Sequence, residues 1–273
     1  MDDEILAIYC LCDEFLKVMG HQDDVQSRMS SAEVMTVAIV AVRHFGGNFK
    51  AARDWLHNPL WIPFMLDKSR FSRRLQRIRH YFETLFEMLA AVWKEQNKHQ
   101  IYNIDTFPVP VCDNIRIKRC RLYSTSEYHG YKSSKKRYFY GLKLHLVTTQ
   151  HGQPVEFLLS PGAVGDVSGL SEFDFDLPDG STIIGDKAYN LYWFEDMLAD
   201  LGLTLLPIRK KNSKRPHESW QRGLQRLCRQ SVETAGSLIN QKMPKSIHAT
   251  DSAGFELKVV LFVLGLSIYH FLR

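Results

Sequence analysis

The sequence lacks the signatures of several common classes of protein. Its five cysteines are scattered, and no two of them have Cys-x-x-Cys spacing, which argues against a zinc ribbon and against a disulfide framework. Neither a Gly-x-x-x-x-Gly-Lys loop nor a Gly-x-Ser-x-Gly elbow occurs, which argues against NTP hydrolysis and serine hydrolase chemistry. The acidic first residues lack the basic start of a signal peptide, so we expect none. We expect reduced thiols in a cytoplasmic protein.

Long apolar runs are also scarce. The strongest one, Leu257 to Leu272, contains Lys258 and His270. It is shorter than the roughly 20 residues that a membrane-spanning helix needs. We therefore expect a buried core helix here and no membrane partner.

The overall composition is that of a globular protein, and its charge is unevenly distributed. Hydrophobic residues make up 45% of the 273 residues and charged residues 24%; 35 basic residues oppose 30 acidic ones, for a net charge of +5. The basic residues gather in Arg70–Arg79, Arg116–Arg137 and Arg209–Arg229, whereas acids dominate the first 25 residues. This asymmetry indicates a polyanionic partner that binds particular faces.

Residues 1–97 are expected to form an all-helical domain, since their apolar residues recur at helical spacing. Ser30 and Glu33 have the spacing of a capping box ahead of one such stripe. In the segment Ser69 to Arg79, apolar residues fall on one helix face and arginines on another. The apolar positions are Phe71, Leu75, Ile78 and Phe82, and the basic ones are Arg70, Arg73, Arg74 and Arg77.

That arginine stripe has two interpretations. A recognition helix presents such guanidinium groups to phosphates and guanines of DNA. An ordinary helix can carry the same stripe as a solvated basic face. The short helices expected before it favour DNA binding.

Residues 98–273 are expected to form an α/β domain with a mixed sheet flanked by helices. The pattern predicts strands at 100–104, 138–149, 155–159, 181–185 and 203–208, and helices at 166–173, 191–201 and around Glu233. Pro108 and Pro110 are expected to interrupt the chain after the first strand.

Two aspartates end predicted strands, and a glutamate lies in a predicted helix. Asp105 follows the first strand, Asp186 follows the fourth, and Glu233 belongs to the long helix. Carboxylates on rigid elements are the ligands that Mg²⁺ prefers, shared with substrate phosphates. The three acids therefore indicate a metal site for phosphodiester chemistry, although strand-terminal aspartates can also be simple caps or turn residues.

Two further basic segments are candidates for nucleic-acid contacts. In the first, Arg119, Lys135 and Lys136 are interleaved with tyrosines, an arrangement that suits stacked bases and backbone contacts; a solvated loop is the alternative. The second is the loop Arg209 to Arg215, which contains Lys210 and Lys211. His145 is interpreted as a structural histidine, and Asp166 as a helix cap rather than an accessory acid.

The whole chain resembles a bacterial insertion-sequence transposase of the DDE class, and it is most similar to the insertion sequence 982 family. The residues that carry the resemblance are Tyr102-Asn-Ile-Asp105, Tyr140-Gly-Leu-Lys-Leu-His145, Pro161-Gly-Ala-Val-Gly-Asp166, Ile184-Gly-Asp-Lys-Ala-Tyr189 and Arg229-Gln-Ser-Val-Glu233. The resemblance implies a ribonuclease-H-like catalytic domain over residues 98–273, preceded by the helical DNA-binding domain over residues 1–97. It also assigns Asp105, Asp186 and Glu233 as the catalytic, metal-binding triad.

The resemblance implies an activity as well. Two Mg²⁺ ions, for which Mn²⁺ can substitute, would activate the attacking oxygen and stabilise the leaving oxygen. The enzyme would cleave DNA at the terminal inverted repeats of its element and join the exposed 3′-hydroxyl to target DNA. Two ends must be handled together, so a homodimer is expected in the synaptic complex, in the bacterial cytoplasm at the nucleoid.

The chain departs from the wider group in the glutamate helix. Where that group often has a tyrosine and a lysine, this chain has Arg226 and Asn240. Arg229 lies one turn before Glu233 and could orient it or contact a phosphate, whereas a surface ion pair is the alternative. Two other functions stay open: a decayed or domesticated DNA-binding protein without chemistry, and a nuclease of the same fold that never joins ends.

Overall fold

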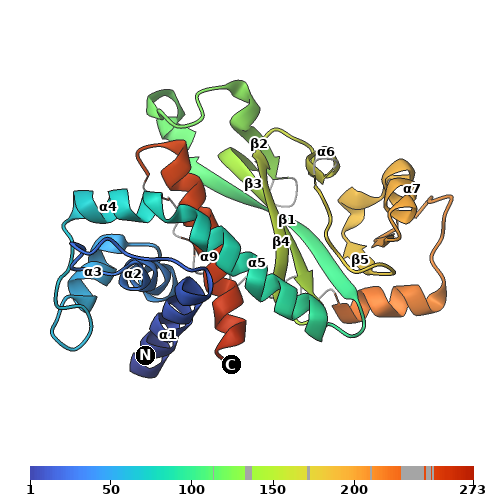
Figure 1. Cartoon of the computed structure of the whole chain (residues 1–273). Coiled ribbons are helices and arrows are strands. Elements are labelled where there is room, and N and C mark those ends of the chain that lie inside the picture. Colours follow the sequence, from blue (N-terminus) through green and yellow to red (C-terminus); the bar gives the residue numbers. More distant parts are fainter. Residues whose placement is uncertain are drawn as a thin grey trace. The chain divides into compact units, whose positions relative to one another are not determined.

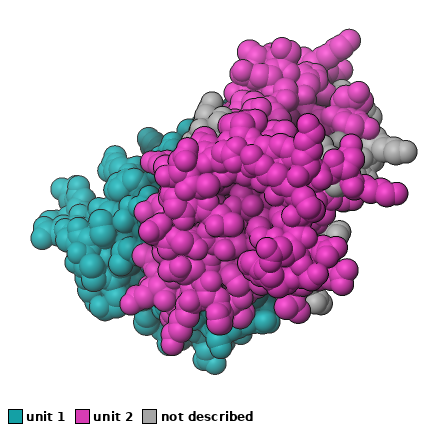
Figure 2. All heavy atoms as spheres, turned by 90° about the vertical axis from the view of Figure 1, so that its right-hand side faces the viewer, with its two compact units in different colours: residues 1–89, 239–273 teal, residues 90–238 magenta. Residues whose placement is uncertain are grey.

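The structure is a computed structural model that describes residues 1–112, 114–132, 137–170, 173–209, 211–228, 243, 247 and 249–273. The chain forms two compact units, coloured separately in Figure 2. Unit 1 comprises Met1–Leu89 and Ile239–Arg273, and unit 2 comprises Ala90–Leu238. The division expected from the sequence, between residues 97 and 98, differs from these units both in the position of that boundary and in where the C-terminal segment belongs.

Unit 1 is helical in its described residues. Its helices are α1 (Asp2–Val18), α2 (Ser31–His44), α3 (Phe49–Leu56), α4 (Lys68–Arg77), the first half of α5 (Arg79–Gln96) and α9 (Ser252–Phe271). The predicted capping box begins α2: the Ser30 hydroxyl accepts from the Glu33 amide at 3.1 Å, and the Ser30 amide donates to the Glu33 carboxylate at 2.6 Å. Because α2 is buried along almost its whole length, it is the central element of this unit.

Helix α9 packs against α2 in unit 1. Gly265 permits the close approach, since a Cβ atom at this position would lie 3.0 Å from Cγ2 of Val42. The helix has 20 residues and is apolar and long enough to cross a membrane, so the sequence-based argument from its length was wrong. Most of it is buried inside the protein, as predicted for a core helix.

Unit 2 is built on the predicted mixed sheet (Figure 1). Its strands are β1 (Ile101–Cys112), β2 (His129–Lys132), β3 (Arg137–Thr149), β4 (Pro154–Pro161), β5 (Thr182–Gly185) and β6 (Thr204–Pro207). The order is β2-β3-β1-β5-β6, and β4 pairs with β3 as well. Strand β3 is antiparallel to β1, β2 and β4, whereas β1, β5 and β6 are parallel to one another.

Strand β1 does not end before its prolines, and this expectation was wrong. Pro108 pairs with Lys143 and Pro110 with Gly141 in the ladder between β1 and β3. The carbonyl of Gln100, an even-numbered position, accepts from Thr182 on the β5 side. Even-numbered residues of β1 therefore face β5, which ends at Gly185. Beyond that point no described strand pairs with this side of β1, so Pro108 and Pro110 lack an N–H group only where no partner strand needs it and proline is tolerated. Asp105 therefore lies inside a long strand.

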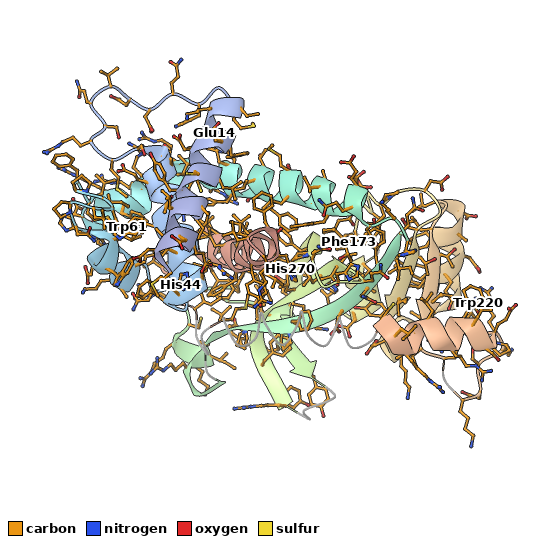
Figure 3. The ribbon with its side chains drawn as sticks, turned by 90° about the horizontal axis from the view of Figure 1, so that it is seen from below. Glu14, His44, Trp61, Phe173, Trp220 and His270 are labelled. Atoms are coloured by element: carbon orange, nitrogen blue, oxygen red, sulfur yellow. The ribbon has the colours of Figure 1, made fainter. Side chains whose placement is uncertain are left out.

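Short helical segments connect or follow these strands. They are η1 (Asn114–Arg119), η2 (Ser126–Tyr128), α6 (Asp166–Leu170), η4 (Lys187–Tyr189), α7 (Tyr192–Asp200) and a helix at residues 219–228. Trp220 projects from this last helix and is exposed (Figure 3). The predicted helix around Glu233 is described only as far as residue 228.

Candidate active site

Asp105 and Asp186 are brought together by the pairing of two parallel strands. The β1–β5 ladder pairs Tyr102 with Ile183 and Asn103 with Ile184. Two positions further along each strand, Asp105 and Asp186 occupy equivalent places. Neighbouring strands lie about 4.8 Å apart, so the two carboxylates are neighbours although 80 residues separate them in the chain.

The two aspartates also share a face of the sheet. Side chains alternate between faces along a strand, and paired residues point to the same side, so Asp186 shares the face of Ile184. Ile184 packs with Leu206 and with Cys228, a residue of the helix at 219–228. That helix therefore covers the face that carries both aspartates. Glu233 follows five residues after Cys228 and lies outside the described residues, as does Arg229.

Each carboxylate is oriented by a backbone amide close to it in the chain. Oδ1 of Asp105 accepts a hydrogen bond from the Thr106 amide at 2.7 Å. Oδ1 of Asp186 accepts from the Ala188 amide at 2.6 Å and so caps the turn η4. Asp105 is half-buried and Asp186 exposed. The site thus presents oriented carboxylate oxygens at the surface of the sheet.

A chain of buried hydrogen bonds lies beside the aspartates, and sequence reasoning missed its members Thr106 and Ser160. The Tyr189 hydroxyl lies 2.8 Å from Oγ1 of Thr106, which lies 3.1 Å from Nδ1 of His145. Nε2 of His145 lies 2.8 Å from Oγ of Ser160. Tyr189, His145 and Ser160 are all buried. The one signal in the sequence is that Thr106 directly follows Asp105.

Three carboxylates act on the Tyr189 phenol. Burial raises its pKa first, and the charges of Asp105, Asp166 and Asp186 raise it further, well above the usual value despite the hydrogen bond with Thr106. The phenol therefore stays protonated. Asp166 begins α6 and pairs with Lys143, whose Nζ lies 2.9 Å from its Oδ1. Asp166 is thus engaged in an ion pair of its own beside the two aspartates.

The buried histidine makes a testable contribution to pH stability. Burial lowers the pKa of His145 to about 4, the charge of Lys143 lowers it too, and Asp166 opposes this. The imidazole therefore takes up a proton near pH 6.5 in the unfolded chain but only near pH 4 in the folded protein. The contribution of His145 to the free energy of unfolding is full above pH 6.5 and is lost as the pH falls toward 4, by about 2 kcal/mol between pH 7 and pH 5.

Denaturant unfolding at a series of pH values measures this effect. We expect His145→Asn to flatten the slope between pH 7 and pH 5, whatever its stability at pH 7. His151→Asn, in the exposed turn between β3 and β4, is the matched control and should keep the slope. An unchanged slope in His145→Asn contradicts the prediction.

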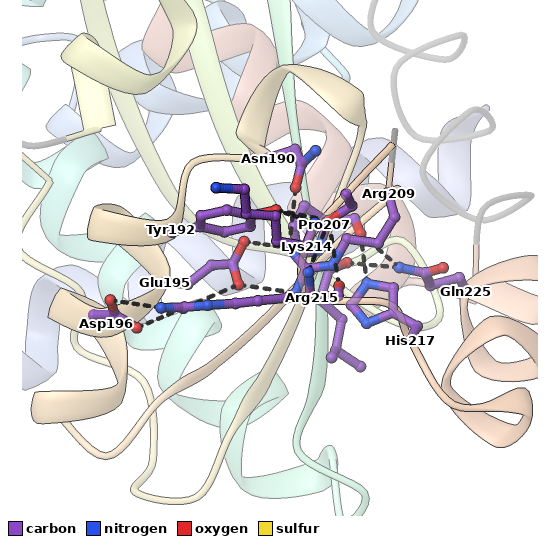
Figure 4. A network of polar contacts seen from close by, with 12 residues as sticks. Asn190, Tyr192, Glu195, Asp196, Pro207, Arg209, Lys214, Arg215, His217 and Gln225 are labelled. Atoms are coloured by element: carbon purple, nitrogen blue, oxygen red, sulfur yellow. Dashed lines mark hydrogen bonds and ion pairs between the residues drawn. The ribbon is translucent and has the colours of Figure 1, made fainter. Parts of the chain in front are cut away.

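Figure 4 shows the polar network that holds the chain after β6. Arg209 forms a two-pronged ion pair with the buried Glu195, with Nη2 2.9 Å from Oε2, and it also donates to Asn190 at 3.0 Å. Gln225, on the helix at 219–228, donates to the carbonyls of Leu206 and Pro207 at 3.1 and 3.0 Å. The network thus fixes the helix that covers the aspartates to the end of β6.

The predicted DNA-contact residues differ in their surroundings. In α4, Arg70, Arg73 and Arg77 are exposed, and the apolar face of the stripe is buried as predicted. Arg74 instead donates from Nη2 to Asp23 at 2.7 Å and to Ser31 at 3.1 Å. Arg119 and Lys211 are exposed. The remaining candidates Lys135, Lys136, Lys210 and Arg229 lie outside the described residues.

Within the described ranges, no group of three His, Cys, Asp or Glu side chains is placed to hold a metal ion. Asp105 and Asp186 supply oxygen ligands at one level of neighbouring strands, as a divalent cation requires. They fit two members of a ligand set whose predicted third member, Glu233, is outside the described part.

The match to a protein-family model agrees with a DNA-processing enzyme. Residues 95–248, more than half of the chain, match the family described as "Transposase DDE domain". The cryo-EM structure of the piggyBac transposase synaptic complex with hairpin DNA is similar at a TM-score of 0.43 and 11% identity, covering 98% of this chain and 71% of that chain. A comparison with curated proteins gives no match. The matched range contains Asp105 and Asp186 and shows that the chain belongs to the transposase DDE domain family.

Proposed function

We propose that this transposase cleaves DNA at the ends of an insertion sequence of the 982 family and joins them to target DNA. The observation that carries the proposal is the parallel pairing of β1 with β5, whose register puts Asp105 and Asp186 each two residues beyond the Asn103–Ile184 pair. The helix that leads toward Glu233 packs on the same face. A ribonuclease-H-like architecture is consistent with the sheet, in which one antiparallel strand, β3, lies beside three parallel ones.

Asp105, Asp186 and Glu233 would hold two Mg²⁺ ions, or Mn²⁺ in their place. Bound ions of this kind activate an attacking oxygen and stabilise a leaving oxygen in an in-line displacement. The protein's own contribution is to orient the ligands: the Thr106 amide holds Asp105, and the Ala188 amide holds Asp186. The first reaction is hydrolysis that exposes a 3′-hydroxyl, and the second is attack of that hydroxyl on target DNA.

The partner is double-stranded DNA, both terminal inverted repeats and target. Exposed arginines on α4 suit phosphate and guanine contacts, and Arg119 and Lys211 add exposed positive charge on unit 2. Lys135, Lys136, Lys210 and Arg229 are proposed to contribute as well. Handling two ends together requires a homodimer in the synaptic complex, which acts in the bacterial cytoplasm at the nucleoid.

Cleavage and joining of a labelled duplex test this function. The duplex carries the DNA that flanks the coding sequence, and the reaction is followed with Mg²⁺, with Mn²⁺ and with EDTA. Metal-dependent nicking at a defined position, followed by transfer of a pre-cut end to a plasmid, is the expected result. Nicking without transfer would favour the nuclease, and tight binding without cleavage in any metal would favour a DNA-binding relic.

The arginines of α4 provide a matched set of variants. Arg73→Ala and Arg77→Ala should each weaken DNA binding and reduce the slope of log affinity against log salt by about one. Neither should lower stability, because both side chains are exposed. Salt-dependent fluorescence anisotropy measures the slope, and an unchanged slope in both variants contradicts a role for α4 in phosphate contacts.

In contrast to these two variants, Arg74→Ala is expected to lower the stability of the fold, because Arg74 pairs with Asp23. Burial raises the pKa of Asp23, but hydrogen bonds from Ser31 and the charge of Arg74 outweigh it, so the net effect lowers the pKa. Losing the partly buried pair should cost about 2 kcal/mol of unfolding free energy at pH 7. The loss should diminish below about pH 4, where the Asp23 carboxyl takes up a proton first in the unfolded chain and, at lower pH, in the folded protein. Urea unfolding at pH 7 and pH 3.5 measures both values.

A further inference from the structure

We infer that Tyr189 is a positioning residue for the metal-binding aspartates. Its hydroxyl bonds to Thr106 and thereby ties the turn that Asp186 begins to the residue that follows Asp105. The inference rests on the proposed function, because it concerns how the two carboxylates are held for divalent metal. It follows from three features of the described structure: the turn η4, the double role of Thr106 and the anchored hydrogen-bond chain behind it.

The turn η4 couples the ring of Tyr189 to Asp186. The Asp186 carboxylate accepts from the Ala188 amide at 2.6 Å, and its carbonyl accepts from the Tyr189 amide at 3.3 Å. Tyr189 is fully buried. Gly185 leaves room for the ring, because a Cβ atom there would lie 2.7 Å from Cδ2 of Tyr189. A shift of the ring therefore moves the turn that orients Asp186.

Thr106 connects the two aspartates through two different groups. Its amide donates to Oδ1 of Asp105 at 2.7 Å, and its hydroxyl lies 2.8 Å from the hydroxyl of Tyr189. The backbone of one residue thus holds the first carboxylate, and its side chain holds the turn that carries the second. The bond between Thr106 and Tyr189 braces β1 against the segment after β5, just where β5 ends and ladder bonds to β1 no longer hold it.

The hydroxyl of Thr106 is itself fixed from behind. His145 on β3 bonds to it at 3.1 Å and to Ser160 on β4 at 2.8 Å. Gly169 of α6 packs directly against the imidazole, since a Cβ atom there would lie 2.7 Å from Nε2. A buried chain in which each member has its partners is rigid. The bond between Thr106 and Tyr189 is therefore supported by β3, β4 and α6, none of which carries a member of the proposed triad.

Hydrogen bonds outside the metal ligands commonly control metal affinity, and removing one typically costs 10- to 100-fold. Tyr189→Phe deletes one oxygen atom and keeps the buried ring. Thr106→Val removes the same bond from the other side at constant shape, together with the bond to His145, and Thr106→Ser restores the hydroxyl. Tyr102→Phe is the matched control: this tyrosine is also buried in the sheet of unit 2, on β1, but the polar groups near its hydroxyl are Asn97 and Ser181 rather than Thr106.

Mn²⁺ binding, followed by electron paramagnetic resonance of the unbound ion, is the direct readout. We expect Tyr189→Phe and Thr106→Val each to raise the dissociation constant about tenfold, and the double variant to raise it no further, because both remove the same bond. Thr106→Ser and Tyr102→Phe should bind as the wild type does. The Mn²⁺ concentration for half-maximal cleavage should rise in parallel, while DNA affinity in EDTA stays unchanged.

The outcomes separate the inference from the proposed function. Wild-type Mn²⁺ affinity in folded Tyr189→Phe would overturn the positioning role and leave the proposed function intact. Equal weakening in Tyr102→Phe would also overturn it, because the effect would then follow from the loss of any buried hydroxyl. A folded wild-type protein that binds no Mn²⁺ would overturn the proposed function, and the inference with it.

Discussion

Asp105→Asn and Asp186→Asn are each expected to reduce metal-dependent DNA cleavage by about 1,000-fold or more. Each would remove a charged oxygen ligand from the proposed metal site, where bound ions would stabilise developing charge by several kcal/mol. Asparagine keeps the shape of the side chain and an oxygen for the amide of Thr106 or Ala188, so the fold should persist. Rates of nicking on the element's end at saturating Mg²⁺ measure the effect.

The comparison needs DNA binding and a matched carboxylate as controls. Binding in EDTA should be retained, since the variants leave the exposed arginines of α4 untouched. Asp200→Asn, at the exposed end of α7, removes one negative charge from the same unit and should cleave at the wild-type rate. Cleavage within tenfold of wild type in both Asp105→Asn and Asp186→Asn would rule out these residues as metal ligands.

Glu195→Gln is expected to lower the unfolding free energy by about 3–5 kcal/mol, because it leaves the buried guanidinium of Arg209 without its counter-charge. Both side chains are largely buried, at 9% and 14% exposed. For a unit of this size the loss corresponds to a fall of about 10 °C in the unfolding midpoint. Circular dichroism during heating measures it, and the variant should also lose cleavage near the midpoint, where the helix at 219–228 detaches from β6.

Asp196→Asn is the matched control on the next residue of α7. Its carboxylate pairs with Arg215 at 2.6 and 3.1 Å, a geometry as good as that of the buried pair. However, Asp196 is 61% exposed and Arg215 45% exposed, and exposed pairs contribute about 0–1 kcal/mol. An equal loss of stability in the two variants would contradict the importance of burial. An unchanged midpoint in Glu195→Gln would contradict the prediction outright.

Much of the architecture could be predicted because its signals are local. The capping box at Ser30 and Glu33, the buried stripe of α4 and the strands that lead to Asp105 and Asp186 all depend on neighbours within a few residues. Periodicity identifies such elements whatever lies around them. The mixed α/β sheet of unit 2 follows from their order and from the short turns between β3 and β4.

Other features could not be predicted because they depend on partners far away in the chain. Pro108 and Pro110 are strand residues only because β5 ends beside them. Arg74 belongs to the arginine stripe by spacing but binds Asp23, 51 residues earlier. Arg209 belongs to a basic loop by composition, yet Glu195 holds it. Periodicity predicts on which face of a helix or strand a side chain lies, but it does not predict which residues from elsewhere in the chain contact that face.

The sequence by itself determined the candidates for the chemistry: acids that follow predicted apolar strands, within a chain whose motifs resemble a DDE transposase. Only the tertiary structure decided that Asp105 and Asp186 occupy equivalent positions along neighbouring parallel segments, because the register of a parallel pair is set by contacts between distant parts of the chain. It also decided that Thr106, Tyr189 and His145 form one buried chain beside them. Hydroxyl and imidazole side chains that bond to one another follow no periodic pattern in a sequence, and their hydrogen bonds exist only once the sheet has formed.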